Sequence, residues 1–464
     1  MTPSLMVFTR DLRVHDNPAL AAAAGVGPVV PLFVLDDAII SRHEQNPTRL
    51  SFLLGSLRDL DGSLRGRGGR LVVRRGPWAK TVVEVAGQAG AGQIHLMDDV
   101  SGYAAARLAR LRDQAGGARL EVRTHPGVLT AGPDGLSPAG GGPYQVFTPY
   151  YRRWLQVPRR DLAPAPGQID GPAGIDPGSI PRLADLTPAR RTVTPPEPGE
   201  TGARKRLAAW SQRYLAEYEA NHDDLAADKT ARLSPYLHLG CLSPLAVVDE
   251  VTGKAGAESF IRQIAWRDFF AQLLAARPEA AHQDYRPPGG AGQGGRPGGA
   301  RRRWNHDPDG LAAWKDGQTG YPVVDAAMRQ LSAEGFMHNR ARMIVASFLT
   351  KDLRIDWREG AAHFMARLAD ADVASNQLNW QWVAGTGTDP QRHRMFNPTR
   401  QGQRFDPGAE YIRRYVPELD GVPAGMIHDP PPALRVARGY PQPILDHVQA
   451  VRAWRSLGQG QAGR

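Results

Sequence analysis

The chain has 464 residues, of which 41% are hydrophobic and 22% are charged. This length is enough for two or three domains with cores of their own, and the composition fits a soluble globular protein. Lysine and arginine number 57 against 47 for aspartate and glutamate, which gives a net charge of +10. Such an excess indicates a polyanionic partner, with nucleic acid first and an anionic membrane surface second, while a solvated basic surface is the plain alternative.

Cysteine occurs once, at Cys241. A single cysteine excludes an internal disulfide and a thiolate metal site, and it indicates a cytoplasmic protein. The N-terminus lacks a secretory signal because Arg10, Asp11 and Arg13 come too early. Glycines and prolines interrupt the apolar run at 19–35, which favours a helix end followed by a strand over a membrane span. We therefore expect a cytoplasmic chain without a membrane segment, and we expect it to be a monomer.

Short apolar runs predict five buried parallel strands in the first part of the chain. Helical patterns lie between them at 48–66, 78–89 and 103–116. This alternation predicts a doubly wound α/β domain over residues 1–130. No G-x-G-x-x-G motif follows the first strand, so the standard dinucleotide fingerprint is missing. The predicted strands cover residues 4–8, 28–35, 70–74, 93–97 and 119–123.

Residues 131–200 are rich in proline and glycine and predict a long connector with an aromatic, anchored part at 143–154. From 201 to 464 the pattern predicts an all-α domain, in which Ser243 and Pro244 mark a helix start. A glycine-rich loop at 287–300 leads into Arg301, Arg302 and Arg303. The strongest helical patterns lie at 257–276, 323–334, 338–353, 359–369 and 443–457.

The segment 335–382 combines helical periodicity with a high density of polar and aromatic side chains. Arg342 lies on its first helix, and Asp370, Asp372 and Asn376 follow. A helical core needs a few aromatic anchors but not these polar neighbours, so the segment predicts a bound planar, polar molecule. The two aspartates could act as general acid and base, or pair with Arg342 and with hydroxyls of a ligand. No histidine or third carboxylate lies near them in sequence, so we predict no metal site.

Three further groups each allow two interpretations. The turn formed by Thr230, Ala231, Arg232, Leu233 and Ser234 could cradle a phosphate or merely cap a helix. Two helix faces could hold an extruded base, or could reflect packing beside surface arginines. Three tryptophans could pass an electron in short hops, or could be core anchors. The two faces consist of Gln263, Trp266 and Arg267, and of Asn339, Arg340 and Met343; the tryptophans are Trp304, Trp357 and Trp380.

Long, ordered motifs along nearly the whole chain resemble the photolyase/cryptochrome family, and most closely its class I bacterial DNA photolyases for cyclobutane pyrimidine dimers. The motifs are FTRDLRVHDNPAL, TARLSPYLHLGCLSP, WRDFF, TGYPVVDAAMRQL, GFMHNRARMIVASFLTKDLRIDWREG and NWQWVAGTGTD. The resemblance implies an α/β antenna domain and a helical domain that holds a folded FAD. It also implies light-driven repair, in which excited reduced FAD gives one electron to a dimer flipped out of the DNA and then regains it.

The resemblance assigns roles to individual positions. Asn376 would face the flavin nitrogen that exchanges a proton. Trp380, Trp357 and Trp304 would carry electrons, in that order outward. FAD would be bound by Tyr218, Thr230, Ala231, Arg232, Leu233, Ser234, Arg342, Asp370, Asp372 and Asn376. The lesion and its DNA would be contacted by His222, Gln263, Trp266, Arg267, Asn339, Arg340, Met343 and Gln401.

Two departures bear on the substrate. Gln263 replaces the family's common glutamate, as it does in (6-4) photolyases and cryptochromes. However, (6-4) enzymes carry histidines where this chain has Asn339 and Met343, and a cyclobutane dimer needs no such proton donor. We therefore keep the cyclobutane dimer as the expected substrate. The segment NQLNW at 376–380 differs from the common NNGGW and could reshape the wall beside the flavin.

The resemblance also implies a second pigment, an antenna, in the N-terminal domain. Arg49 and Asp99 match residues that hold 8-hydroxy-5-deazaflavin, and His238 replaces a lysine of that site. We therefore expect deazaflavin as the antenna, with 5,10-methenyltetrahydrofolate second and an empty pocket third. A blue-light sensor of the cryptochrome kind is the first alternative function, although the short segment after Trp454 argues against it. A helical DNA-binding module without a cofactor is the second.

Overall fold

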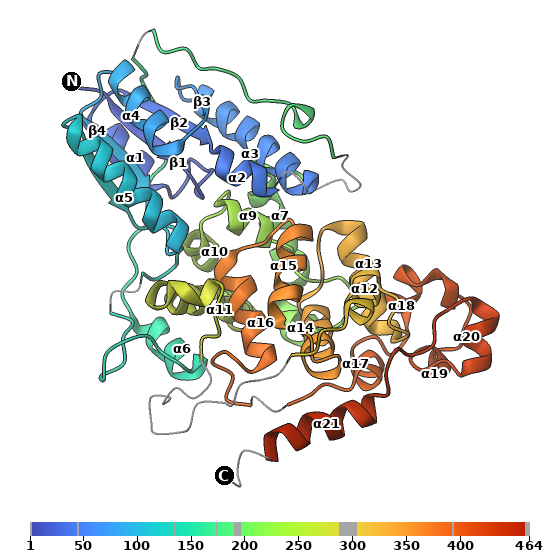
Figure 1. Ribbon diagram of the computed structural model, residues 1–464. Helices are drawn as coiled ribbons and strands as arrows, with labels where there is room; N and C mark the ends of the chain where they lie inside the picture. The colour runs from blue at the N-terminus through green and yellow to red at the C-terminus, as the bar shows by residue number, and fades with distance from the viewer. Residues whose placement is uncertain are drawn as a thin grey trace. The chain divides into compact units, whose positions relative to one another are not determined.

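The apolar runs of the N-terminal part form one parallel sheet in the computed structural model (Figure 1). The sheet order is β3-β2-β1-β4-β5, and Ser4 of β1 lies opposite Val29 of β2 and Gln93 of β4. Every residue of β1 and β2 is buried because helices cover both faces, as a doubly wound sheet requires. The strands are β1 (Ser4–Phe8), β2 (Val29–Leu35), β3 (Val72–Arg75), β4 (Gln93–Met97) and β5 (Glu121–His125). This confirms the predicted α/β architecture.

The chain forms two compact units. The first unit comprises Met1–Ala216 and Ala231–Pro278, and the second comprises Glu217–Thr230 and Glu279–Arg464. The first unit therefore includes helices that the sequence predicts to lie in the domain beginning at 201. The predicted domain limits stay a prediction. The structure describes residues 2–43, 46–132, 135–172, 174–189, 196–286, 304–391 and 394–459.

Several helices of the first unit begin at side-chain caps. Asn17 accepts a hydrogen bond from the Leu20 amide at the start of α1, and Ser243 accepts one from the Ala246 amide at the start of α10, as predicted. Right-handed crossovers place the helices after β1 and β2 on one face of the sheet and those after β3 and β4 on the other. The helices are α1 (Pro18–Val26), α2 (Asp37–His43), α3 (Pro47–Arg65), α4 (Trp78–Gln88), α5 (Gly102–Gly117), α6 (Phe147–Gln156), η1 (Leu183–Asp185), α7 (Gly199–Tyr214), α9 (Ser234–Leu239), α10 (Pro244–Val251) and α11 (Ala257–Ala276), with η2 (Leu215–Glu217) and η3 (Pro278–Ala281) at the unit boundaries.

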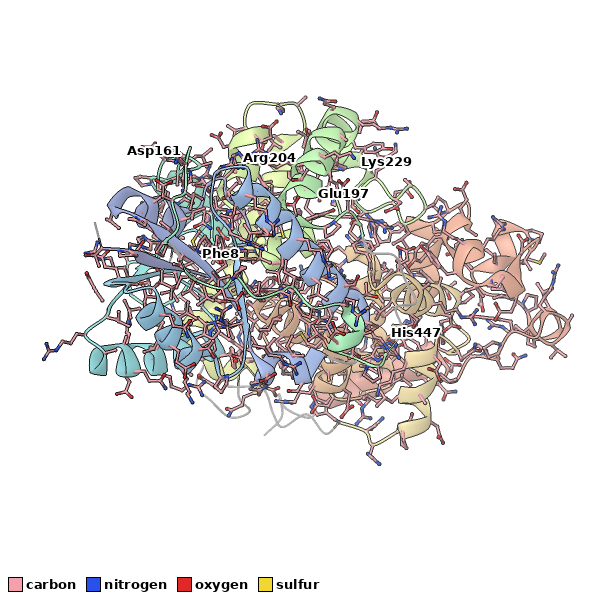
Figure 2. All side chains as sticks on the ribbon, turned by 90° about the horizontal axis from the view of Figure 1, so that it is seen from above. Phe8, Asp161, Glu197, Arg204, Lys229 and His447 are labelled. Carbon is pink, nitrogen blue, oxygen red and sulfur yellow. The ribbon has the colours of Figure 1, made fainter. Side chains whose placement is uncertain are left out.

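Hydrogen bonds hold the proline-rich connector against the sheet. The amide of Val29 donates to the Asp170 carbonyl, and the amide of Val73 donates to the Pro177 carbonyl. These bonds satisfy backbone groups that the short strands leave unpaired. Over residues 135–172 and 174–189 the connector is irregular chain interrupted by α6 and η1. Phe8, the last residue of β1, is buried in the same body and is labelled in Figure 2.

The second unit is a helical bundle with the long central segment in its core. The predicted helix at 338–353 ends at Ser347 and continues as a wider π-helical turn, in which the Leu353 amide donates to the Phe348 carbonyl. This turn buries Asp352, which contacts His447 of the last helix. The helices are α8 (Tyr218–Asn221), α12 (Pro308–Asp316), α13 (Pro322–Glu334), α14 (Asn339–Ser347), η4 (Phe348–Asp352), α15 (Trp357–Arg367), α16 (Val373–Ala384), α17 (Pro398–Phe405), α18 (Glu410–Tyr415), η5 (Pro417–Leu419), α19 (Ala424–Ile427), α20 (Pro432–Arg438) and α21 (His447–Gln459).

The loop at 287–300 and the arginines Arg301, Arg302 and Arg303 lie outside the described residues. Within the described residues, every helix is too short or too polar to cross a lipid bilayer.

A buried histidine pair in the first unit predicts that the stability of this unit depends on pH. His95 is fully buried on β4, and its ring stacks on His125 with centroids 5.2 Å apart. Burial and the neighbouring His125 lower the pKa of His95 to about 4. The folded state therefore excludes a proton that the unfolded chain binds below about pH 6.5. The stability that this neutral pair contributes is complete above that pH and is lost as the pH falls towards 4.

We expect His95→Gln to flatten the fall in the free energy of unfolding between about pH 7 and about pH 5. Urea denaturation at the two pH values measures this slope. The exposed His306 provides the control, because His306→Gln should keep the wild-type slope. An unchanged slope in His95→Gln would show that the buried pair does not set the pH dependence.

Candidate functional site

An arginine–carboxylate pair in the second unit joins two of the predicted ligand segments. Both terminal nitrogens of the Arg342 guanidinium donate to Asp370, at 3.3 and 2.8 Å, and its Nε donates to the Met337 carbonyl at 2.8 Å. The Asp370 side chain is 3% exposed and that of Arg342 is 26% exposed. Asp372 caps α16 by accepting from the Ser375 amide at 2.8 Å. The structure thus brings three predicted residues to the start of α16.

Asn376 lies in the first turn of α16. Among the described residues, one polar atom of its side chain is hydrogen-bonded and the other is not. Its amide nitrogen donates to the Ala361 carbonyl of α15 at 3.0 Å. Its amide oxygen makes no hydrogen bond within the described part of the chain, although the residue is only 8% exposed. The bond to Ala361 orients the amide, so the oxygen is available to accept a hydrogen bond from a ligand.

The predicted phosphate turn contains a buried hydroxyl without a protein partner. The Oγ1 atom of Thr230 is buried and unbonded among the described residues. Arg232 adopts φ +49°, a conformation that non-glycine residues adopt mainly where surrounding contacts impose it. Tyr218 precedes this turn, and burial raises the pKa of its phenol. Tyr218 and Thr230 belong to the second unit, whereas Ala231 to Ser234 belong to the first.

The predicted electron-transfer tryptophans differ in exposure. Trp380 and Trp357 are 3% and 0% exposed, whereas Trp304 is partly exposed. The Trp357 indole nitrogen donates to Asp284 at 2.8 Å. Within the described residues, the ring contacts of Trp380 are with Phe364 at 5.0 Å and with Trp314 at 6.0 Å, between centroids. Sequence reasoning did not single out Trp314, whose place beside Trp380 follows from helix packing.

Two predicted DNA contacts meet at one carboxylate in the second unit. The Arg340 guanidinium donates twice to Asp223, at 3.1 and 2.5 Å, and lies over the Phe405 ring. The Nε2 atom of His222 is 3.8 Å from the same carboxylate. The remaining predicted residues of this unit are accessible to different degrees, Asn339 being exposed and Met343 and Gln401 partly exposed.

The predicted contacts on α11 divide into surface and interior groups. Gln263 is exposed and Trp266 is partly exposed. Arg267 instead donates to the Val128 carbonyl at 2.8 Å and lies 3.5 Å from Asp268. The Trp266 ring stacks face to face on Phe147 of α6, with centroids 3.7 Å apart. Sequence reasoning missed Phe147 as a site residue, although it recognised 143–154 as an anchored aromatic segment.

Two of the three predicted antenna residues meet at a residue that sequence reasoning did not select. The Nε atom of Arg10 donates to the His238 carbonyl at 3.0 Å, and its Nη1 atom donates to Asp99 at 3.4 Å. Arg49 is buried on α3. This cluster lies after the carboxyl ends of β1 and β4, where parallel α/β sheets bind ligands.

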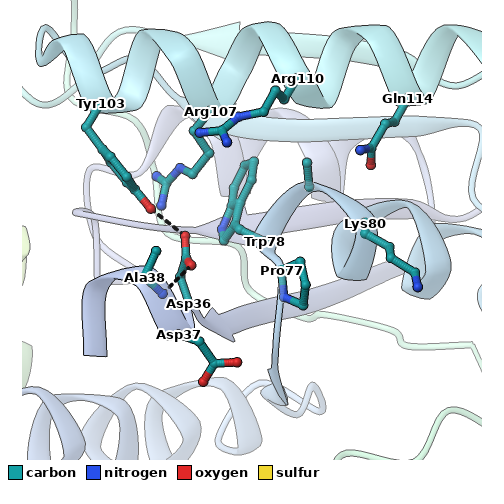
Figure 3. Close-up of a pocket in the computed structure, with 11 residues that line it drawn as sticks. Asp36, Asp37, Ala38, Pro77, Trp78, Lys80, Tyr103, Arg107, Arg110 and Gln114 are labelled. Atoms are coloured by element: carbon teal, nitrogen blue, oxygen red, sulfur yellow. Dashed lines mark hydrogen bonds between the residues drawn. The ribbon is translucent and has the colours of Figure 1, made fainter. Parts of the chain in front are cut away.

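A cavity of about 590 Å³ opens between α4 and α5 of the same unit (Figure 3). Asp36 on its floor accepts hydrogen bonds from the Tyr103 hydroxyl at 2.6 Å and the Ala38 amide at 3.1 Å. The Arg107 guanidinium lies 4.2 Å above the Trp78 ring and makes no hydrogen bond to the described residues. The residues drawn around this cavity do not include Arg49, Asp99 or His238.

These features define a two-part protein with a doubly wound α/β body and a helical ligand-binding bundle. Two family models match the chain: residues 4–167 match that of DNA photolyase, and residues 260–457 match the FAD binding domain of DNA photolyase. A deoxyribodipyrimidine photo-lyase of Streptomyces griseus is 46% identical over 97% of this chain and 98% of its own length. The chain therefore belongs to the DNA photolyase family.

Solved structures agree with this assignment. A bacterial class III photolyase from Agrobacterium tumefaciens has a TM-score of 0.89 at 34% identity, covering 99% of this chain and 98% of its own. A cryptochrome from Synechocystis has a TM-score of 0.88 at 28% identity, covering 98% of this chain and 99% of its own. The fold is thus common to repair enzymes and cryptochromes.

The residues of the second unit fit the FAD that the family model implies. The unbonded oxygens of Thr230 and Asn376 and the buried, unpartnered Oε1 of Gln377 are polar atoms that a ligand with hydroxyl and ring N–H groups can satisfy. The Arg342–Asp370 pair adds charge-assisted donors and acceptors beside them. FAD is accordingly the cofactor of this domain.

The placement of Trp380 depends on a glycine in the crossing helix. A Cβ atom on Gly360 of α15 would lie 2.2 Å from Cη2 of Trp380, so any larger residue must displace the indole. We expect Gly360→Ala to lower the free energy of unfolding by about 1–3 kcal/mol through overpacking. Because the resemblance assigns Trp380 to electron transfer, we also expect light-driven reduction of oxidised FAD to slow.

The matched control is Gly62→Ala in α3, where nothing lies within 4 Å of the added atom. That variant should keep the photoreduction rate and gain up to about 1 kcal/mol of stability from helix propensity. Transient absorption of FAD and chemical denaturation measure the two quantities. Normal photoreduction in Gly360→Ala would show that the indole tolerates displacement.

Proposed function

We propose that this chain is a deoxyribodipyrimidine photo-lyase, which uses light to repair cyclobutane pyrimidine dimers in DNA. The observation that carries the proposal is the 46% identity to the enzyme of that name from Streptomyces griseus over nearly the whole of both chains. The unsatisfied polar atoms around α16 support it, because they match the needs of a flavin. The net charge of +10 supports DNA as the partner.

The predicted cofactor-binding and electron-transfer residues of the second unit have separate roles in this function. When bound, FAD supplies an electron from its light-excited reduced form. Arg342 and Asp370, which are bonded to each other, would hold the cofactor by further charge-assisted hydrogen bonds. Asn376, oriented by its bond to Ala361, would offer its amide oxygen to a ring N–H group of the flavin. Trp380, Trp357 and Trp304 would pass electrons inward from the surface to the oxidised cofactor.

The DNA contacts follow from charge and ring chemistry. Extruding a dimer from the duplex costs a few kcal/mol of free energy. This cost is lower than the cost of extruding two intact pyrimidines, because the lesion weakens stacking and base pairing. Arg340 and His222 would contact phosphates near the extruded nucleotides. In the first unit, Trp266 would stack on a pyrimidine. In the second unit, Asn339 and Met343 would contact the lesion. Phosphate contacts of this kind make the affinity fall steeply with salt.

The test of this function separates repair from photoreduction. Illumination of the chemically reduced protein with a dimer-containing oligonucleotide should restore the 260 nm absorbance of intact thymines. Trp380→Phe should abolish photoreduction of oxidised FAD but leave this repair unchanged, because the chemically reduced cofactor needs no electron relay. Trp210→Phe, a buried indole in the first unit, should change neither property.

The outcomes are distinct. Absence of repair by fully reduced wild-type protein would refute the proposed function. Loss of both photoreduction and repair in Trp380→Phe would contradict the relay role alone.

A blue-light sensor is the second candidate, and the similarity to the Synechocystis cryptochrome favours it. Such a protein would photoreduce its flavin and leave dimers intact, so the same assay distinguishes the two. Repair of (6-4) photoproducts is a further alternative. It is disfavoured because Asn339 and Met343 supply no imidazole for proton transfer.

We propose further that the first unit binds an antenna pigment, 8-hydroxy-5-deazaflavin, with 5,10-methenyltetrahydrofolate as the alternative. The cluster of Arg10, Asp99 and the His238 backbone supports this site. The cavity of Figure 3 would extend it. Burial lowers the pKa of Arg107, while the carboxylates of Asp99 and Asp36 raise it, which links the cavity to the cluster electrostatically.

Pigment extraction from native protein, followed by mass measurement, identifies the antenna. On reconstitution with synthetic 8-hydroxy-5-deazaflavin, we expect Arg107→Gln to lower the antenna-to-FAD ratio several-fold, because the cavity loses its unpaired guanidinium. Arg112→Gln, an exposed neighbour on α5, should keep the ratio. Extraction of the folate would favour the alternative pigment. Failure of the wild-type protein to take up either pigment would refute an antenna site here.

A further inference from the structure

The ring of Trp266 is placed by a second helix as well as by its own. Phe147, the first residue of α6, lies parallel to the indole at 5° with centroids 3.7 Å apart. Aromatic pairs favour offset or edge-to-face geometry over a face-to-face sandwich. Surrounding groups must therefore hold this pair in place.

Phe147 is enclosed by aromatic and cationic neighbours. Tyr151, one turn later on α6, stacks on it with centroids 5.6 Å apart at 13°. The Arg262 guanidinium of α11 lies 5.4 Å from the Phe147 ring and 5.5 Å from that of Tyr151. Phe269 meets Phe147 and Trp266 edge-on, at 5.7 and 5.5 Å. With Phe147 only 5% exposed, the ring has little freedom to turn.

A buried carboxylate fixes α6 against α11. Asp268, fully buried on α11, accepts hydrogen bonds from the Trp154 indole nitrogen at 3.1 Å and from the Thr130 and Ala131 amides at 3.0 and 3.2 Å. Gln272, one turn later, donates to the Tyr144 carbonyl at 2.9 Å. These bonds anchor the connector on both sides of Phe147. The position of the Phe147 ring is therefore set by a bonded framework rather than by local helix geometry alone.

We propose that Phe147 is a positioning residue for lesion binding, which covers one face of the Trp266 indole and fixes its plane so that a flipped-out pyrimidine can stack on the ring. This proposal rests on the proposed function, because that function supplies the stacking partner. Trp266 remains partly exposed while Phe147 is buried, so the pair has an accessible ring backed by an inaccessible one. A preorganised ring loses less conformational freedom on binding than a mobile one.

The decisive measurement is the ratio of affinities for a dimer-containing and an undamaged oligonucleotide of the same sequence. Stacking of a base on an aromatic side chain contributes enough that its loss weakens binding about tenfold. We expect Phe147→Leu, which removes the flat ring but keeps an apolar side chain, to lower the ratio by about that factor. Binding of the undamaged oligonucleotide and photoreduction of FAD should stay at wild-type values. Phe147→Tyr, which retains a flat aromatic ring, should keep the wild-type ratio.

The matched control is Phe260→Leu, on α11 and also 5% exposed, whose ring packs against Trp210 at 4.5 Å. It should lower the melting temperature as Phe147→Leu does but keep the wild-type ratio. An unchanged ratio in Phe147→Leu, or an equal loss in Phe260→Leu, overturns the proposal. If Phe147→Leu does not fold, Phe147→Met is measured in its place against the same criteria. A wild-type protein that neither prefers the dimer nor repairs it would instead refute the proposed function.

Discussion

A charge buried in a protein must find partners, and this requirement organises much of the chain. Asp268 is the clearest case, because its carboxylate is fully buried and accepts hydrogen bonds from the amides of Thr130 and Ala131 and from the Trp154 indole. Arg13 acts in the same way within the first unit, donating to the carbonyls of Asp16, Gly127 and Gly240. Removing one partner of such a group leaves an uncompensated charge, which is far more costly than losing a surface ion pair.

Buried polar atoms that lack a hydrogen-bond partner also indicate where ligands can bind. Buried polar atoms in folded proteins are nearly always bonded, so the exceptions are informative. In the second unit, the buried oxygens of Thr230 and Gln377 that have no partner among the described residues lie on the predicted phosphate turn and on α16, the helix of Asn376. In the first unit, the Arg107 guanidinium lies at a cavity with an indole behind it.

Some of the predicted site residues gather at one place in the structure, whereas others bond to the protein interior. Arg342, Asp370 and Asp372 gather at the start of α16, as their assignment to one ligand requires. Arg267, although one turn from Gln263, is turned inward to the Val128 carbonyl. Helical periodicity places these two residues on one side of α11, but it does not say what packs against that side. The partner of Arg267 is Val128, which lies in irregular chain after β5 where no periodic pattern predicts the path.

The sequence by itself determined the strands, the main helices and the family, because apolar periodicity, helix caps and long ordered motifs are properties of neighbouring residues. Ser243 and Pro244 predicted a helix start because a cap is a local interaction. Only the tertiary structure placed Phe147 beneath Trp266 and joined Asp99 to His238 through Arg10. These contacts unite residues that are distant in the chain. Their geometry depends on how whole helices pack, which no local pattern encodes.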